Sequence, residues 1–237
     1  MRIIAALHER GRAAYLSHLD MQRTLQRALR RADMPLVYSQ GFNPHPLVAF
    51  AGALSTGYES EREWFDVRLE GEIIPADFEA RLNEVLPEGM AVSHAMEAPE
   101  DLGTLTGHLA AARYTLWVRP ERAFSAAEVG SALDKLLQSE ELMVQKRTKS
   151  GAMVPQNIRP QLYEARLTAC DGASFALDVL GELTAGGGLR TEAFVNVLLD
   201  FLGSAGSFQC RREEMYFDDL PGLPSLGKGK NEQRDLS

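Results

Sequence analysis

Residues 3–32 read IIAALHERGRAAYLSHLDMQRTLQRALRRA, and this stretch decides the fold. It opens with an apolar run, Ile3–Leu7, that predicts a strand. After Ser17, a predicted N-cap, apolar residues recur at helical spacing as far as about Asp33. A strand followed by an amphipathic helix is the first half of a β-α-β unit, so the chain is expected to mix strands and helices in alternation.

The rest of the chain continues this alternation. Pro75 suits the first position of a helix, Ser125 with Glu128 forms a capping box, and Gly203 suits a helix end. Further helices are therefore predicted over about 75–86, 125–138 and 190–202. Strands are predicted over 47–54, 64–69, 90–96, 113–119, 142–146, 162–169, 174–180 and 208–217, with a hairpin turn at 170–173.

Residues 1–98 and residues 112–217 thus show the same order, β-α-β-β-α-β, which is typical of the ferredoxin-like fold. The sequence predicts an α+β protein made of two tandem ferredoxin-like domains with antiparallel sheets. The first domain would hold an arginine-rich helix and the loop GFNPHP. Residues 99–111 are expected to form a linker, and residues 218–237 a flexible tail.

Composition narrows the class of protein. The chain has 237 residues, 45% of them hydrophobic, with no apolar run long enough to span a membrane. The N-terminal apolar run is too short for a signal peptide, so a cytoplasmic protein is expected. Two cysteines exclude a disulfide framework and a four-iron cluster held by this chain. No His, Cys and Asp spacing fits a metal site, so neither metal nor cofactor is expected.

Charge is distributed unevenly along the chain. Residues 1–50 carry seven arginines against three acids, a local charge of +4, whereas residues 51–110 carry thirteen acids against three arginines, a local charge of −10. The net charge is −8. This pattern indicates basic patches on an acidic body, which would repel nucleic acid except where the patches face it.

The first helix carries the clearest functional signal. Four arginines fall within about 100° of one another on the helical wheel, opposite the apolar stripe. Guanidinium groups on one exposed face bind phosphates or an acidic protein surface, and the alternative is a solvated face. We favour the first interpretation because no acid is interleaved between Asp20 and Asp33. The four are Arg23, Arg27, Arg30 and Arg31.

The segment after this helix, YSQGFNPHP at 38–46, is a loop restricted by two prolines. Residues before proline are held out of the helical region, which fixes Asn43 and His45. A rigid loop that presents Phe42, Asn43 and His45 suits recognition of a base or another planar group. A purely structural turn with Phe42 packed inward explains the sequence equally well.

The second half offers two weaker candidates. A basic stretch contains Lys146, Arg147 and Lys149, with Arg159 at the end of the same connection. Such a stretch is a common nucleic-acid contact and equally a common solvated loop. The glycine run at 186–188 leads through Arg190 into the last helix, where backbone amides can bind an anion. It lacks both nucleotide-binding glycine patterns, so a flexible turn is slightly favoured.

The motifs YLSHLD at 15–20, YSQGFNPHP at 38–46 and NIRP at 157–160 resemble the radical SAM-associated (radical SAM-linked) protein family, a bacterial family of unknown function. The resemblance covers most of residues 1–217. It implies a B12-binding radical SAM protein as partner and a role in RNA or ribosome maturation. This chain has no C-x-x-x-C-x-x-C motif, so it cannot carry out a radical step itself.

Three functions follow as hypotheses. The first is a non-catalytic RNA-binding or adaptor subunit beside a radical SAM enzyme. The second, by analogy of fold, is a metal-independent endoribonuclease in which His45 or His18 acts as general base. The third is a protein-interaction module whose acidic 59–101 region docks a basic partner without RNA contact. We expect the first.

Overall fold

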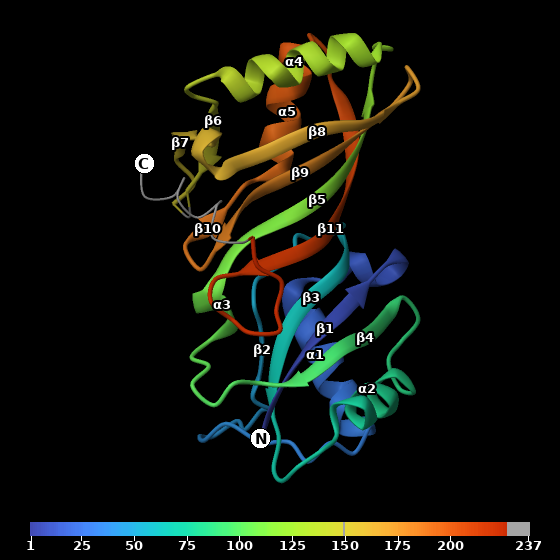
Figure 1. Ribbon diagram of the computed structural model, residues 1–237, viewed down its shortest axis with the longest axis vertical. Helices are drawn as coiled ribbons and strands as arrows, with labels where there is room; N and C mark the ends of the chain where they lie inside the picture. The colour runs from blue at the N-terminus through green and yellow to red at the C-terminus, as the bar shows by residue number, and fades with distance from the viewer. Residues whose placement is uncertain (149, 227–237) are drawn as a thin grey trace. The chain divides into compact units, whose positions relative to one another are not determined.

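The computed structural model describes residues 1–148 and 150–226. The chain has an α+β fold with a nine-stranded sheet and a separate two-stranded hairpin (Figure 1). It divides into two compact units, the first formed by Met1–Ala110 with Arg212–Ser225 and the second built on Ala111–Arg211. The chain therefore leaves the first unit after Ala110 and returns to it at Arg212.

The first unit contains a sheet in the order β2-β3-β1-β4, and each neighbouring pair is antiparallel. Its last strand, β11, lies beside β3. The elements are β1 (Arg2–Glu9), the 3-10 helix η1 (Gly11–Tyr15), α1 (His18–Arg31), β2 (Val48–Phe50), β3 (Glu59–Arg68), α2 (Pro75–Asn83), β4 (Met90–Glu97), α3 (Leu105–His108) and the second half of β11 (Gly206–Phe217).

One face of this sheet forms the core with both long helices. Alternate residues of β1 point to the same face, so Ile3, Ala5 and Leu7 all pack against helices. The helices contribute their apolar stripes, which include Leu25 of α1 and Phe78 of α2. Burying these stripes is the main stabilising contribution, since apolar area removed from water contributes about 25 cal/mol per Å².

Helix boundaries agree with the capping signals in the sequence. Ser17 accepts a hydrogen bond from the backbone N–H of Asp20 at 3.2 Å, and Pro75 begins α2. Ser125 and Glu128 form a capping box at the start of α4. These predictions are confirmed, because side-chain oxygens satisfy backbone N–H groups that a helix cannot pair internally.

The second unit has the order β8-β9-β5, again antiparallel, with β10 beside β9 and the first half of β11 beside β5. The predicted hairpin turn after Cys170 is present, since Cys170 pairs with Phe175. The elements are β5 (Leu109–Pro120), α4 (Ala126–Gln138), β6 (Met143–Arg147), β7 (Met153–Asn157), the 3-10 helix η2 (Arg159–Gln161), β8 (Leu162–Cys170), β9 (Phe175–Thr184), β10 (Gly187–Gly188) and α5 (Thr191–Phe201).

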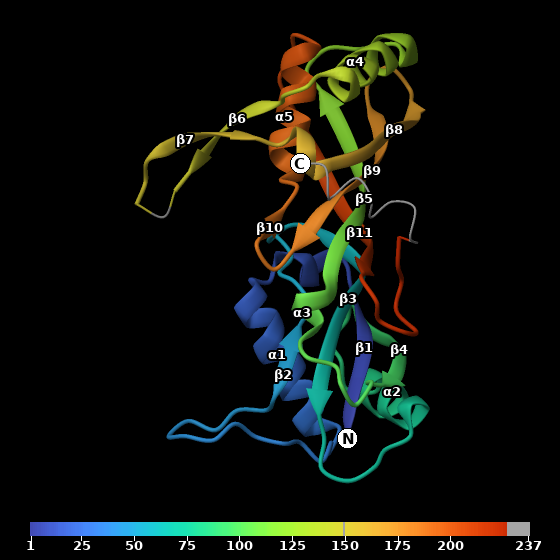
Figure 2. The same cartoon turned by 60° about the vertical axis from the view of Figure 1, so that its left-hand side comes forward.

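Several predicted segments differ from the structure. The strand expected at 47–54 is only β2, because the chain bends at Ala51 and Gly52. The 99–111 segment, expected as a linker, contains α3 and the buried start of β5. Two residues of the basic stretch, Lys146 and Arg147, lie in β6 of the β6–β7 hairpin, which projects from the second unit in Figure 2.

The predicted tail also differs near its start. Leu220 and Leu223 are buried, and the backbone N–H of Asp218 donates to the carbonyl of His108 at 2.8 Å. Two leucines in a stretch rich in proline and glycine give no periodic pattern, so the sequence offered no sign of this packing. The part of the predicted tail beyond residue 226 lies outside the described residues.

Candidate functional site

The four arginines predicted on α1 are all exposed. Their interactions within the protein are weak. Arg23 lies 3.6 Å from Asp20, a long contact between exposed groups, and Arg27 donates a hydrogen bond to the Thr24 hydroxyl at 3.1 Å. Arg31 donates to the carbonyl of Val85 at 2.6 Å. An exposed pair of this kind contributes little to stability, so these guanidiniums remain available to an anion. We call this surface the arginine face.

The predicted rigid loop is an extended arm that starts at Tyr38, soon after α1 ends. Tyr38 bridges to Pro46, and the Ser39 N–H donates to the carbonyl of His45 at 2.9 Å. The Ser39 hydroxyl also lies 2.9 Å from Nδ1 of His45. The arm stands out from the first unit in Figure 2. Its two sides are therefore hydrogen-bonded to each other.

Phe42 lies at the tip of this arm and is fully exposed, with a relative accessibility of 105%. The interpretation with Phe42 packed inward is therefore wrong. Asn43 and His45 are exposed as well. The phenyl ring therefore contributes nothing to the core and is available for contact with a ligand.

The remaining predicted site residues lie in the second unit. Lys146 and Arg147 are exposed on β6, and Lys149 lies outside the described residues. Arg159 is half-buried and donates to the carbonyls of Leu162 at 2.8 Å and Leu137 at 2.7 Å. These bonds give Arg159 a structural role, since they pair a carbonyl in the last turn of α4 and the carbonyl at the start of β8.

The glycine run before α5 forms a tight hairpin. Gly187 and Gly188 make β10, paired with β9, and Arg190 is the exposed N-cap residue of α5 without a side-chain capping bond. A Cβ at Gly188 would lie 2.4 Å from the carbonyl oxygen of Glu182. This close approach explains the glycine at 188, because any larger residue would collide with the backbone.

The two histidines considered as general bases occupy different settings. His45 is tied to Ser39 in the arm. His18 lies edge-on to Phe50, with ring centroids 5.6 Å apart. Partial burial lowers the pKa of the His18 imidazole, and the positive charge of Arg212 lowers it further. A neutral imidazole is favoured at this position.

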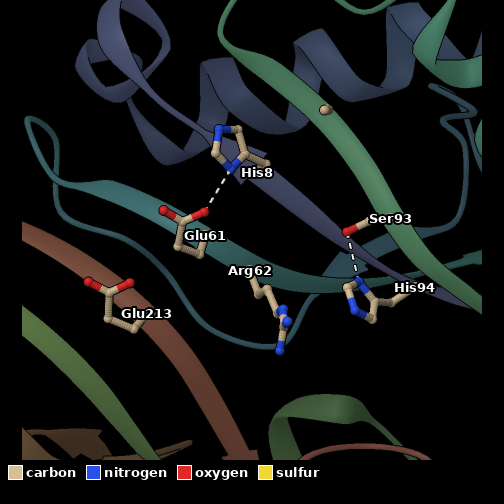
Figure 3. A pocket seen from close by; sticks show the side chains of 7 residues that line it. His8, Glu61, Arg62, Ser93, His94 and Glu213 are labelled. Atoms are coloured by element: carbon tan, nitrogen blue, oxygen red, sulfur yellow. Dashed lines mark hydrogen bonds and ion pairs between the residues drawn. The ribbon is translucent and has the colours of Figure 1, made fainter.

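An open hollow of about 590 Å³ was not predicted from the sequence (Figure 3). Within it, Nδ1 of His8 lies 3.2 Å from a carboxylate oxygen of Glu61, and Nδ1 of His94 lies 2.8 Å from the Ser93 hydroxyl. Each imidazole therefore has one ring nitrogen held by a neighbour. The residues that line the hollow are His8, Glu61, Arg62, Ala91, Ser93, His94 and Glu213.

His94 has a backbone φ of +56°, in the left-handed region that residues other than glycine rarely adopt. The register between β1 and β4 shifts between Ile4 and Ala6, next to this residue. The extra residue in β4 breaks the alternation, so His94 is exposed although its sequence parity matches that of buried Val92.

A buried charged cluster also lies in the first unit. Nη1 of Arg212 donates to both carboxylate oxygens of Glu63, at 3.1 and 2.8 Å, and Nη2 donates to the carbonyl of Ala53 at 2.9 Å. Glu9, nearby on β1, is buried too. The pKa of Glu9 is raised to about 8, chiefly by burial and also by the charge of Glu63, while the charge of Arg212 opposes both effects.

Two absences apply to residues 1–148 and 150–226. No three His, Cys, Asp or Glu side chains in this part of the chain meet in a way that could hold a metal ion. Within the same ranges, no helix combines the length and apolar character needed to cross a membrane.

Known structures share the fold of this chain at low sequence identity. The archaeal box H/ACA sRNP Nop10-Cbf5 complex contains a chain with 10% identity and a TM-score of 0.50, matched over 89% of this chain and 46% of that chain. A chain of an H/ACA RNP bound to a substrate RNA containing 2'-deoxyuridine has 10% identity and a TM-score of 0.52, over 95% and 51%. This chain therefore spans about half of each.

Sequence comparison places the chain in a family. No curated protein has significant similarity to it. Residues 2–190 match the family described as "Uncharacterized protein conserved in bacteria (DUF2344)". Since the match covers most of the chain, the protein belongs to this bacterial family. The sequence-based expectation of a bacterial family of unknown function is thereby confirmed at that level.

Proposed function

We propose that this protein is a non-catalytic accessory subunit that binds RNA and works beside a B12-binding radical SAM enzyme in RNA or ribosome maturation. One observation carries the RNA-binding part: the arginine face and the arm that presents Phe42 are both exposed, and they follow each other directly along the chain. Guanidiniums bind phosphates, and an exposed phenyl ring can stack on a base.

The charge distribution supports the same function. The arginine face lies in the segment with a local charge of +4, and the following residues carry −10. Phosphate groups would be attracted to α1 and repelled by the acidic remainder of the first unit. The H/ACA RNP chain bound to a substrate RNA shares the fold but supports no role for individual residues, since its sequence is only 10% identical to this chain.

The radical SAM partner rests on the sequence resemblance, chiefly the motif at 38–46. We expect the two proteins to co-purify when they are produced together, both with and without ribonuclease treatment. Co-purification that depends on RNA would indicate that RNA links them. Absence of any association would contradict the adaptor role. Association without any affinity for RNA would favour the protein-interaction module.

Filter binding with a structured RNA tests the RNA-binding part. Changing Arg23, Arg27 and Arg30 to Ala should weaken binding by on the order of tenfold or more at low salt. The slope of log affinity against log salt should fall by about 0.9 for each phosphate that the variant no longer neutralises. The control changes three exposed cations of the second unit, Arg119, Lys135 and Arg166, to Ala. Equal binding by both triple variants would refute the arginine face.

A second candidate, metal-independent RNA cleavage, is favoured by the hollow of Figure 3. His8 and His94 each have one ring nitrogen held, which leaves the other to take or give a proton. Cleavage in EDTA that is lost in both His8→Ala and His94→Ala would establish it. Cleavage lost only in His45→Ala or His18→Ala would place the base elsewhere.

The finer fold assignment is also part of this proposal. We propose that each unit is a ferredoxin-like repeat. The support is that the strand orders β2-β3-β1-β4 and β8-β9-β5-β11 correspond position by position. The helices correspond as well, since α4 follows β5 as α1 follows β1, and α5 comes after β9 as α2 comes after β3. A structure of either half solved alone, with its β11 segment supplied as a peptide, would test this assignment.

A further inference from the structure

A small cavity in the first unit is lined both by the buried charged cluster and by exposed residues. Glu9 and Glu63 are its buried lining residues, and His18 and Ser55 are its exposed ones. It has room for about one water-sized group. Its walls are apolar and consist of Leu16, Met21, Phe50 and Leu54.

Glu9 is the residue that this cavity leaves unexplained. Only 4% of its surface is exposed, and its side chain has no hydrogen-bond partner among the described residues. Arg212 directs its Nη1 to Glu63 and its Nη2 to Ala53. Two buried carboxyl groups therefore face a single guanidinium. Buried polar groups are nearly always paired, so an unpaired buried carboxyl calls for a partner that the chain itself does not supply.

We infer that this cavity binds a primary alkylammonium group, with the ammonium filling the water-sized space against Glu9 and its hydrocarbon stem leading out over the half-buried side chains of Leu16 and Phe50. An ammonium is close to water in size and offers three N–H donors. Once Glu9 has lost its proton, the ammonium would add the second positive charge that the cluster of two carboxylates and one guanidinium then lacks. The stem would remove Leu16 and Phe50 from water.

The charges around Glu9 fix the pH dependence of binding. Glu63 on β3 attracts the ammonium, whereas Arg212 on β11 repels it, and the Arg212–Glu63 pair leaves these two effects largely balanced. His18 on α1 is neutral when its pKa is lowered. Glu9, with a pKa of about 8, is protonated at pH 7 and must lose its proton to pair with a cation. Binding should therefore strengthen as the pH rises from 7 towards 9.

Two sources share this chemistry, a free polyamine and a lysine side chain of a partner protein. Binding of either would be independent of the arginine face, because the cavity uses none of its residues. Three probes separate the sources: n-butylammonium as the shared group, spermidine as the polyamine, and Nα-acetyl-lysine amide as the lysine side chain.

Calorimetric titration of the full chain tests the inference. n-Butylammonium should bind more tightly at pH 8.5 than at pH 7. At pH 7 binding should release a proton, so the measured binding enthalpy should depend on the ionisation enthalpy of the buffer. Glu9→Gln should weaken binding by about tenfold or more and abolish the proton release. The matched control is Glu88→Gln, at an exposed glutamate outside the cavity, and this variant should bind n-butylammonium as tightly as the wild-type protein does.

The n-butyltrimethylammonium ion completes the design, since it has the charge but no N–H donor and is too bulky for a water-sized space. Equal binding of this ion, binding unchanged in Glu9→Gln, or no binding of n-butylammonium would each overturn the inference. Thermal unfolding of Glu9→Gln verifies that the variant is folded. Stronger binding of spermidine than of the lysine amide assigns the site to polyamines, and the reverse assigns it to a partner's lysine.

Discussion

Arg212 and Glu63 form a salt bridge inside the first unit, 149 residues apart in the sequence, with 4% and 3% of their side chains exposed. Nη1 of Arg212 lies 2.8 Å from Oε2 of Glu63. The pair ties the returning end of the chain to β3. It also stabilises one of the two carboxyl groups that line the cavity beside Glu9.

Removing the Arg212 side chain should therefore lower the free energy of unfolding strongly. Arg212→Met leaves Glu63 buried without its cation, and breaking a buried pair on one side costs about 3–5 kcal/mol. Urea unfolding should show this loss. The double variant Arg212→Met with Glu63→Leu should recover much of it, because no unpaired charge is left in the core. A double variant as unstable as the single one would contradict this explanation.

Glu9 should make stability depend on pH. Its pKa is raised in the folded protein, so the folded state holds a proton that the unfolded state releases above its ordinary pKa of 4.5. The stabilisation from this group is complete at low pH and is lost as the pH rises from about 4.5 to about 8. Relative to Glu9→Gln, the unchanged chain should lose roughly 4 kcal/mol between pH 5 and pH 9. Denaturant titrations at both pH values measure this difference; parallel pH profiles would exclude it.

Phe42→Ala should separate binding from stability. The ring is fully exposed, so its removal should change the free energy of unfolding by less than about 0.5 kcal/mol. Affinity for single-stranded RNA should fall by about 1–3 kcal/mol if one base stacks on the ring. Ile74→Ala, at an exposed apolar residue elsewhere in the first unit, is the control and should leave RNA binding unchanged.

Gly89 should tolerate no side chain. Its φ is +84°, and a Cβ would lie 2.4 Å from the carbonyl oxygen of Arg10. That carbonyl cannot easily move away, because the backbone N–H of Arg10 donates to the carbonyl of Gly89 at 2.8 Å. Gly89→Ala should destabilise the protein by more than about 2 kcal/mol, whereas Gly71→Ala, at φ +70° with open space around it, should cost only about 1 kcal/mol from backbone strain. Similar thermal shifts for both variants would contradict the steric explanation.

Local signals predicted the helices well, because caps and apolar stripes act within a few residues. Ser17, Pro75 and Ser125 begin helices where the sequence indicated. The arginine face was also predictable, since exposure on a helix follows from its periodicity. The partners of buried charges were not. Arg212 stands in a run of charged residues that is typical of a solvent-exposed segment, and its burial depends on β3, far away in the sequence.

The hollow and the cavity escaped prediction for a similar reason. His8 and His94 come from strands more than 80 residues apart, and a register shift in β4 turns His94 outward. Glu9 comes two residues after the apolar run Ile3–Leu7 and looks like part of the polar segment that follows it. Only the pairing of β1 with β3 places it beside Glu63.

The passage of the chain between the two units has a consequence for biosynthesis. Residues 111–211 are all translated before the ribosome reaches Arg212. The second unit is thus available to collapse early, while the first unit waits for its closing strand and for the partner of Glu63. A released fragment of residues 1–211 should hold a protease-resistant portion within 111–211 and an N-terminal portion that is still cleavable, the reverse of the usual order in which N-terminal domains fold first.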